Sequence, residues 1–222
     1  MDLQVREQEI FETLRKLRNC NFVIIGGYAV NAYTLPRFSV DCDLVVKDDV
    51  EKVKKILVGL GYIKRGNSSY NFERFEKEIR TNFIVSMDLL FKEVVDRQTN
   101  VIFNVDWIFN HSTIRVLKGK TITKELSLRI IDLDALFIMK FISSRSTDIR
   151  DIFMLAPYLH NTEWVHKEIS QRYSFKDRFS IIKKKINSSQ FKDGLQGVYG
   201  YLDEKVFEKH RQALLNLDHT NS

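Results

Sequence analysis

Two aspartates stand two residues apart within an apolar run of the chain. Asp41 and Asp43 lie in VDCDLVV, whose composition predicts a β-strand. Side chains alternate across a strand, so both carboxylates project from one face, with Cα atoms roughly 6.5–7 Å apart. Like charges in apolar surroundings are costly unless a cation neutralises them, and hard carboxylate oxygens suit Mg²⁺ or Mn²⁺. The spacing therefore predicts a metal site. The alternative is a solvent-facing strand of alternating polarity.

A third carboxylate stands alone in another apolar segment. Asp88 is the only charged residue of NFIVSMDLLF, a pattern that predicts an almost wholly buried strand. If this strand neighbours the one that carries Asp41 and Asp43, the three carboxylates can hold two metal ions. Asp88 can then act as general base toward an acceptor hydroxyl. The alternative is that Asp88 is a turn residue at a strand end.

A glycine pair precedes the acidic strand. Gly26 and Gly27 follow the apolar run Phe22–Ile25 and are placed where a predicted strand meets a helix start, so their backbone N–H groups can cradle a triphosphate. A glycine pair also marks an ordinary tight turn. Its position fourteen residues before Asp41 is nevertheless the order that a nucleotide-transferring site requires. Arg37, between them, can clamp a phosphate or remain solvated.

A lysine lies in a helix that is predicted to be apolar nearly all round. Lys140 falls in LDALFIMKFI, where burying an ammonium is costly without an anion. A nucleotide phosphate is one such partner, and snorkelling of the side chain to solvent is the alternative. Arg145, Asp148 and Asp151 follow at helical spacing. An ion-pair network that orients Lys140 therefore competes with an ordinary solvated face.

The elements around these residues predict an α+β fold, in which a mixed β-sheet flanked by helices precedes a helical domain. Periodicity predicts helices in the first part of the chain over residues 3–17 and 49–60. Strands beside the acidic one are predicted at 22–25, 70–75, 82–91 and 126–131, with a hairpin over 113–123 that turns at Lys118-Gly119-Lys120. Further helices are predicted over 132–143, 148–160, 163–173, 176–186 and 203–217. We expect residues 1–131 to form the core and residues 132–222 to form a helical domain that contributes Lys140 to the site.

Composition narrows the class of protein. Hydrophobic residues make up 44% and charged residues 29% of the 222 residues, which is typical of an ordered globular chain. The first nineteen residues have an amphipathic helical pattern rather than that of a signal peptide, and no apolar run is long enough to span a membrane. We therefore expect a cytoplasmic protein without membrane contact, with Cys20 and Cys42 as reduced thiols. The formal net charge of +6 is compatible with contact with phosphates without requiring it.

Two segments resemble a known family. GGYAVNAYTLPRFSVDCDLVV resembles the G-G…R-x-[ST]-x-D-x-D signature of minimal and abortive-infection-type, toxin-like nucleotidyltransferases of the DNA-polymerase-beta-like superfamily. IIDLDALFIMKFISSRSTDIRDIFML is similar to their downstream L…K…R-x-K-D-x-x-D segment. The resemblance covers roughly Phe22 to Leu155. Two departures are Ser39 at the usual threonine position and Thr147 where a lysine is common, and the second bears on a downstream phosphate or acceptor contact.

The resemblance implies a polymerase-beta-like core and a role for each matching residue. Asp41, Asp43 and Asp88 are implied to be catalytic and to hold metal. The implied nucleotide-binding residues are Gly26, Gly27, Arg37, Ser39, Lys140, Asp148 and Asp151. The toxin-like character of the family also implies that a cognate antitoxin could be a partner.

Together these features predict a Mg²⁺-dependent nucleotidyltransferase that moves a nucleoside monophosphate from an NTP to a hydroxyl and releases pyrophosphate. A tRNA end or other RNA fits the basic balance and Lys183-Lys184-Lys185, although this lysine run also fits a solvated helix face. The sequence leaves two other classes of acceptor open, which are a small hydroxylated molecule of the aminoglycoside type and a protein side chain. The rival interpretation is a non-catalytic nucleotide-binding or RNA-binding, antitoxin-like module of the same fold.

Overall fold

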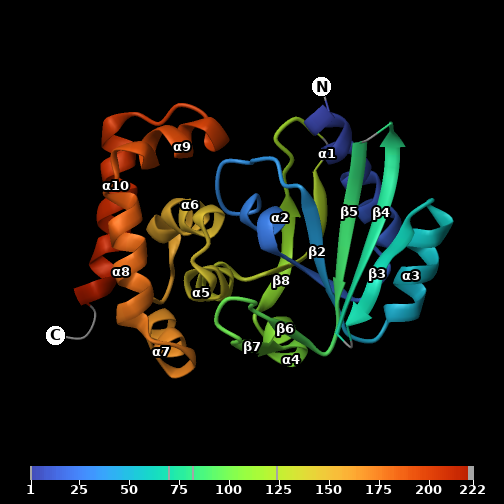
Figure 1. Ribbon diagram of the computed structural model, residues 1–222, viewed down its shortest axis with the longest axis horizontal. Helices are drawn as coiled ribbons and strands as arrows, with labels where there is room; N and C mark the ends of the chain where they lie inside the picture. The colour runs from blue at the N-terminus through green and yellow to red at the C-terminus, as the bar shows by residue number, and fades with distance from the viewer. Residues whose placement is uncertain (1, 70, 82, 124, 220–222) are drawn as a thin grey trace. The chain divides into compact units, whose positions relative to one another are not determined.

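The computed structural model describes residues 2–69, 71–81, 83–123 and 125–219. The chain divides into two compact units (Figure 1). The first is built within residues 1–32, 36–94 and 102–131, and the second within residues 33–35, 95–101 and 132–222. The predicted strand starts at Tyr70 and Asn82 lie outside the described residues.

A mixed β-sheet forms the centre of the first unit, in the order β3-β4-β5-β2-β1-β9-β8 (Figure 1). Its strands are β1 (Phe22–Ile25), β2 (Asp41–Val46), β3 (Ile63–Ser69), β4 (Phe72–Arg80), β5 (Phe83–Leu90), β8 (Ser112–Leu117) and β9 (Leu126–Ile131). Two pairs, β2 with β5 and β1 with β9, are parallel, and the other neighbours are antiparallel. Two short strands, β6 (Glu93–Val95) and β7 (Ile102–Asn104), pair separately.

The helices of the first unit are α1 (Asp2–Leu17), α2 (Gly26–Val30), α3 (Val50–Gly59) and α4 (Val105–Asn110). α1 packs on β5 and α3, and its residues Ile10, Leu14 and Leu17 are fully buried and share one helical face because they are spaced three or four residues apart. This helix closes over the apolar central strands, so the core of the unit lies between α1 and the sheet.

Helices make up the second unit. They are α5 (Leu133–Ser143), α6 (Ser146–Leu155), α7 (Thr162–Arg172), α8 (Phe175–Ile186), α9 (Ser189–Tyr199) and α10 (Glu204–Leu215), with 3₁₀ turns at Ala156–Tyr158 and Asn216–His219. α5 is buried at every position except Met139, as expected of a helix that is apolar nearly all round. α6, α7 and α8 pack against it. None of the described helices has the length and apolar character needed to cross a bilayer.

The α+β fold class is confirmed, but several elements differ from the sequence-based prediction. The helix expected over 148–160 ends at Leu155, and a 3₁₀ turn that contains Pro157 follows it. α9 was not predicted, because Gly194 and Gly197 lower its helix propensity. The strand β3 was also missed, as were the short elements β6, β7 and α4.

The predicted hairpin over residues 113–123 is wrong in its second arm. The chain turns after Leu117 as expected, but Thr121–Thr123 form no strand, and β8 pairs with β9 instead. Glu7 supplies the physical reason. Its buried carboxylate accepts hydrogen bonds from the backbone N–H groups of Lys120 at 2.6 Å and Thr121 at 2.8 Å, and from the Thr121 hydroxyl at 2.6 Å. Backbone donors that a strand ladder would need are therefore bound to α1.

We expect Glu7→Ala to lower the free energy of unfolding by about 2–4 kcal/mol, because it leaves several polar donors of the loop without their acceptor. Urea denaturation followed by circular dichroism measures the loss. Glu12→Ala is the matched control, since Glu12 is an exposed glutamate of the same helix. An equal loss in both variants would mean that the loop does not depend on Glu7.

Candidate active site

Three carboxylates share one face of the sheet because of the register between two parallel strands. β2 and β5 pair so that Asp43 lies opposite Asp88, and Asp41 lies opposite Ser86. Residues that are directly opposite each other on neighbouring strands project from the same face, and so do residues two apart on one strand. A site of three carboxylates requires that the strand carrying Asp88 neighbour the strand carrying Asp41 and Asp43. The two strands are neighbours in the sheet.

The residue between the two aspartates of β2 faces the other way. Cys42 is completely buried, whereas the Asp41 side chain keeps 38% of its surface exposed. Burial, followed by the nearby charge of Asp43, raises the pKa of the Cys42 thiol well above its ordinary value. The strand therefore presents a neutral thiol to the core and its carboxylates to the opposite face.

The glycine pair leaves room for the side chains of this face. Gly26 has φ +65°, and a Cβ atom there would lie 1.9 Å from Oδ2 of Asp43. A Cβ atom on Gly27 would lie 2.2 Å from Oγ of Ser39 and 3.2 Å from Nη2 of Arg37. The structure thus brings Gly26, Gly27, Arg37, Ser39 and Asp43 together, all within the first unit.

A buried asparagine that sequence reasoning missed holds the segment before β2. Asn31 is fully buried, and its side-chain amide donates to the Arg37 carbonyl at 2.9 Å and accepts from the Arg37 N–H at 3.0 Å. The Arg37 guanidinium also donates to the carbonyl of Phe38 at 3.0 Å. Asn31 thereby fixes the backbone at Arg37. A buried amide one turn after the glycine pair was the available signal, since such a group needs partners.

An arginine from the neighbouring strand binds the third carboxylate. Arg74 of β4 lies opposite Asp88 in the register, and donates from Nε to Oδ1 at 2.8 Å and from Nη2 to Oδ2 at 2.6 Å. Nη2 also lies 3.5 Å from Oδ2 of Asp41. The hydrogen bonds to Asp88 raise the pKa of Arg74 above its ordinary value, so the guanidinium stays charged. Sequence reasoning missed this residue, although a lone buried carboxylate demands a partner.

The arrangement of the three carboxylates suits a hard divalent cation bound by two of them better than one bound by all three. Among the described residues, no three Asp, Glu, His or Cys side chains converge as metal ligands. Arg74 donates to both oxygens of Asp88, whereas its contact with Asp41 is longer, at 3.5 Å, and the Asp41 side chain is partly exposed. Mg²⁺ commonly uses one or two protein carboxylates and completes its shell with water and substrate oxygens. Asp41 and Asp43 meet that requirement.

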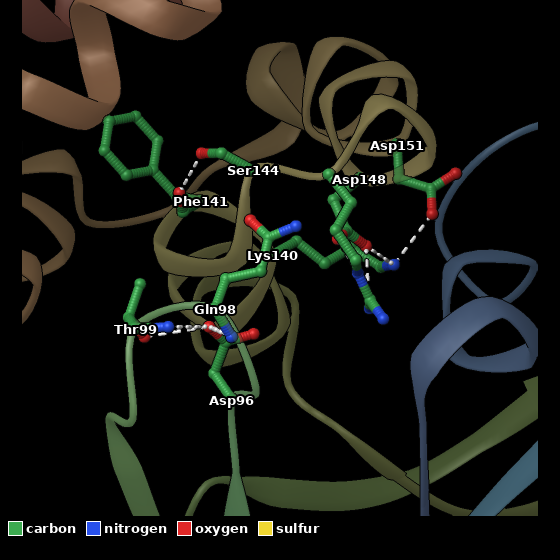
Figure 2. A network of polar contacts seen from close by, with 9 residues as sticks. Asp96, Gln98, Thr99, Lys140, Phe141, Ser144, Asp148 and Asp151 are labelled. Atoms are coloured by element: carbon green, nitrogen blue, oxygen red, sulfur yellow. Dashed lines mark hydrogen bonds and ion pairs between the residues drawn. The ribbon is translucent and has the colours of Figure 1, made fainter.

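The remaining predicted residues form a network inside the helical unit (Figure 2). The Lys140 ammonium lies 3.0 Å from Oδ1 of Asp148 and 2.7 Å from Oδ2 of Asp151, and all three side chains are buried. Arg145 binds the other oxygen of Asp148 at 2.6 Å, and the Tyr199 hydroxyl donates to Asp151 at 2.6 Å. Of the two alternatives that the sequence left open for Lys140, Asp148 and Asp151, the structure contains the ion-pair network and not the solvated face.

This network is balanced in charge. Burial opposes ionisation of Asp148, but Lys140 and Arg145 outweigh it and hold the pKa of Asp148 below its ordinary value. Two cations and two carboxylates offset each other, so Lys140 has its anions within its own unit. The need for an anion beside the buried ammonium, which predicted a phosphate there, is met by Asp148 and Asp151.

We expect Lys140→Met to lower the free energy of unfolding by about 3–5 kcal/mol, because it leaves two buried carboxylates without their shared cation. Chemical denaturation measures the change. Lys167→Met, at an exposed lysine of the same unit, should stay within about 0.5 kcal/mol of the parent. Adding Asp148→Asn and Asp151→Asn to Lys140→Met should recover part of the loss, and a variant at Lys140 as stable as the parent would contradict the role of the network.

We also expect Gly26→Ala to be destabilising by about 2–4 kcal/mol, because it combines a left-handed backbone with a methyl group inside contact distance of the Asp43 carboxylate. Gly59→Ala is the matched control: Gly59 ends α3, and a Cβ atom there meets nothing within 4 Å. Thermal and urea unfolding of both variants would give the comparison. Equal stability of the two would mean that the turn at Gly26 tolerates a side chain.

Comparison with known proteins adds evidence on the fold. No protein-family model and no curated protein matches the chain. The crystal structure of ANT(2'')-Ia in complex with adenylyl-2''-tobramycin is similar, with a TM-score of 0.53 and 16% identity, over 79% of this chain and 99% of that one. The solution structure of the antibiotic-resistance factor ANT(2'')-Ia has a TM-score of 0.53 and 16% identity, over 83% of this chain and 97% of that one.

The crystal structure of JHP933 from Helicobacter pylori has a TM-score of 0.50 and 13% identity, over 98% of this chain and 90% of that one. At such identities the likeness concerns the fold. The chain therefore shares its fold with ANT(2'')-Ia, which is consistent with the resemblance carried by its two signature segments.

Proposed function

We propose that this protein is a Mg²⁺-dependent nucleotidyltransferase that transfers a nucleoside monophosphate from an NTP to an acceptor hydroxyl. The single observation that carries the proposal is the register of β2 and β5, which sets Asp41, Asp43 and Asp88 on one face, with Gly26 against Asp43. Carboxylates beside a glycine turn are groups that can bind the metal ion and the phosphates in nucleotidyl transfer.

The glycine turn and the segment before β2 are proposed to bind the triphosphate. The backbone N–H groups of Gly26 and Gly27 would donate to phosphate oxygens, and the lack of side chains at both positions lets Asp43 and Ser39 lie beside them. The hydroxyl of Ser39 and the guanidinium of Arg37 both border Gly27 and can bind phosphate oxygens. Asn31 keeps this segment in place through its two hydrogen bonds to the Arg37 backbone.

The acidic face is proposed to hold the metal and to accept the proton. Asp41 and Asp43 would bind Mg²⁺ or Mn²⁺, which neutralises charge on the pyrophosphate leaving group and makes the acceptor hydroxyl more acidic. The acceptor oxygen forms a bond to the α-phosphorus while the bond from that phosphorus to pyrophosphate breaks, and the hydroxyl proton passes to Asp88. Each oxygen of Asp88 receives one N–H from Arg74 and keeps a further lone pair for this proton.

Two classes of acceptor have support. The fold is similar to that of ANT(2'')-Ia, whose crystal structure holds adenylyl-2''-tobramycin, and this favours a small hydroxylated molecule. The net charge of +6 and the lysines at 183 and 184, which are exposed on α8, favour an RNA such as a tRNA end. A cytoplasmic location and a cognate antitoxin belong to the same proposal. Lys140, Asp148 and Asp151 remain predicted nucleotide contacts, although their balanced charges favour a structural role.

The experiment is incubation with each α-labelled NTP and Mg²⁺, in separate reactions with total RNA and with a panel of aminoglycosides. The parent chain should label one acceptor class. Asp41→Asn/Asp43→Asn should reduce labelling to background, and Asp88→Asn should reduce it about a hundredfold or more while NTP binding persists. Asp48→Asn, at an exposed aspartate just after β2, should transfer at the parental rate.

The outcomes separate the alternatives. Unimpaired transfer by Asp88→Asn would remove Asp88 from the general-base role. A parent chain that binds NTP, as shown by a thermal shift that depends on Asp41 and Asp43, yet labels no acceptor would instead support the non-catalytic binding module.

A further inference from the structure

The guanidinium of Arg74 lies beside two of the three carboxylates of this face. It binds both oxygens of Asp88, at 2.8 and 2.6 Å, and the same Nη2 that reaches Oδ2 of Asp88 lies 3.5 Å from Oδ2 of Asp41. Arg74 therefore spans carboxylates from two strands, β5 and β2. Sheet pairing fixes its backbone directly opposite Asp88, so this position is set by the fold and not by a mobile loop.

Charge gives the first argument about what else this face can bind. Asp41, Asp43, Asp88 and Arg74 together carry a formal charge of −2, and the Arg37 guanidinium beside Gly27 adds further positive charge, so one divalent cation is enough to balance these carboxylates. A second divalent cation held by the same side chains would leave an excess of positive charge before any nucleotide arrives. An arginine does not lose its proton at physiological pH, so its contribution is permanent.

Access gives the second argument. The Asp88 side chain is 6% exposed, and each of its oxygens already accepts an N–H from Arg74. A metal ion on Asp88 would lie beside the guanidinium that already donates to both carboxylate oxygens, so it would either be repelled by that fixed positive charge or have to displace a bidentate, charge-assisted pair. Asp41 is 38% exposed, and its contact with Arg74 at 3.5 Å is longer, so it stays accessible to a cation.

We infer that Arg74 supplies the positive charge between Asp41 and Asp88 that a second metal ion would otherwise supply, so that the acidic face binds one divalent cation, on Asp41 and Asp43. This inference rests on the proposed function. It makes Arg74 a positioning residue, which holds Asp88 in place, and it departs from the expectation that three carboxylates share two metal ions.

The test is titration of the apo protein with Mn²⁺ alone, with free Mn²⁺ measured by electron paramagnetic resonance. The parent chain should bind one Mn²⁺, and Arg74→Met should bind two, or bind one at least tenfold more tightly, because Asp88 becomes available. Arg74→Met/Asp88→Asn should return to one Mn²⁺ of parental affinity. Arg80→Met is the control, since Arg80 is an exposed arginine of the same strand, roughly 20 Å along β4.

Asp88→Asn alone keeps the test decisive if Arg74→Met fails to fold. It should still bind one Mn²⁺ within about threefold of the parental affinity, because Asp88 is not a ligand while Arg74 holds it. Two Mn²⁺ ions on the parent chain, unchanged binding by folded Arg74→Met, or loss of Mn²⁺ from Asp88→Asn would each overturn the inference.

Failure of the proposed function gives a different result. The proposed metal site is absent if the parent chain and the Asp41→Asn/Asp43→Asn variant bind the same amount of Mn²⁺, or if neither binds any. The inference about Arg74 then falls with the proposed function.

Discussion

The parallel pairing of β2 with β5 is the constraint on which the candidate active site depends. It opposes Asp43 to Asp88 and places Asp41 on the same face, so that negative charge accumulates within a sheet whose other face is apolar. A shift of one residue would turn Asp88 into the core and Met87 toward the carboxylates. The register is fixed because Met87, Leu89, Cys42 and Leu44 fill the opposite face completely. Core packing thus determines which charges meet.

Accumulated charge has to be compensated, and the two compact units do this in related ways. In the first, Arg74 neutralises part of a carboxylate face that keeps a net negative charge and one partly exposed aspartate. In the second, Lys140 lies between two fully buried aspartates, and the charges balance. A surplus of charge with access to solvent is a property of a binding site, whereas a closed and balanced network is a property of a scaffold. This contrast is why the proposed chemistry is assigned to the carboxylate face.

The sequence predicted what depends on local pattern. The Asp41 and Asp43 spacing, the apolar strand around Asp88 and the glycine turn all follow from the alternation of residues along one segment. What it could not predict depends on register or on distant partners. Arg74 is one of several alternating charges in FERFEKEIR, and only the pairing of β4 with β5 selects it as the partner of Asp88.

Distance along the chain explains the largest error in the predicted fold. The second arm of the hairpin near residue 121 looked like a strand, but its backbone donors bind a side chain 113 or 114 residues earlier, at Glu7. No window of local sequence contains both partners. Lys140 is a milder case, because its partners Asp148 and Asp151 were visible at helical spacing, and only burial could decide between an ion pair and a solvated face.

The second compact unit is not a continuous stretch of chain. Residues 33–35 and 95–101 group with it, although the polypeptide returns to the sheet after each of them. A fragment that began at residue 132 would therefore lack two of the three segments from which the unit is made. Recombination with a single crossover at residue 132 would therefore exchange the helices without the two short stretches that group with them.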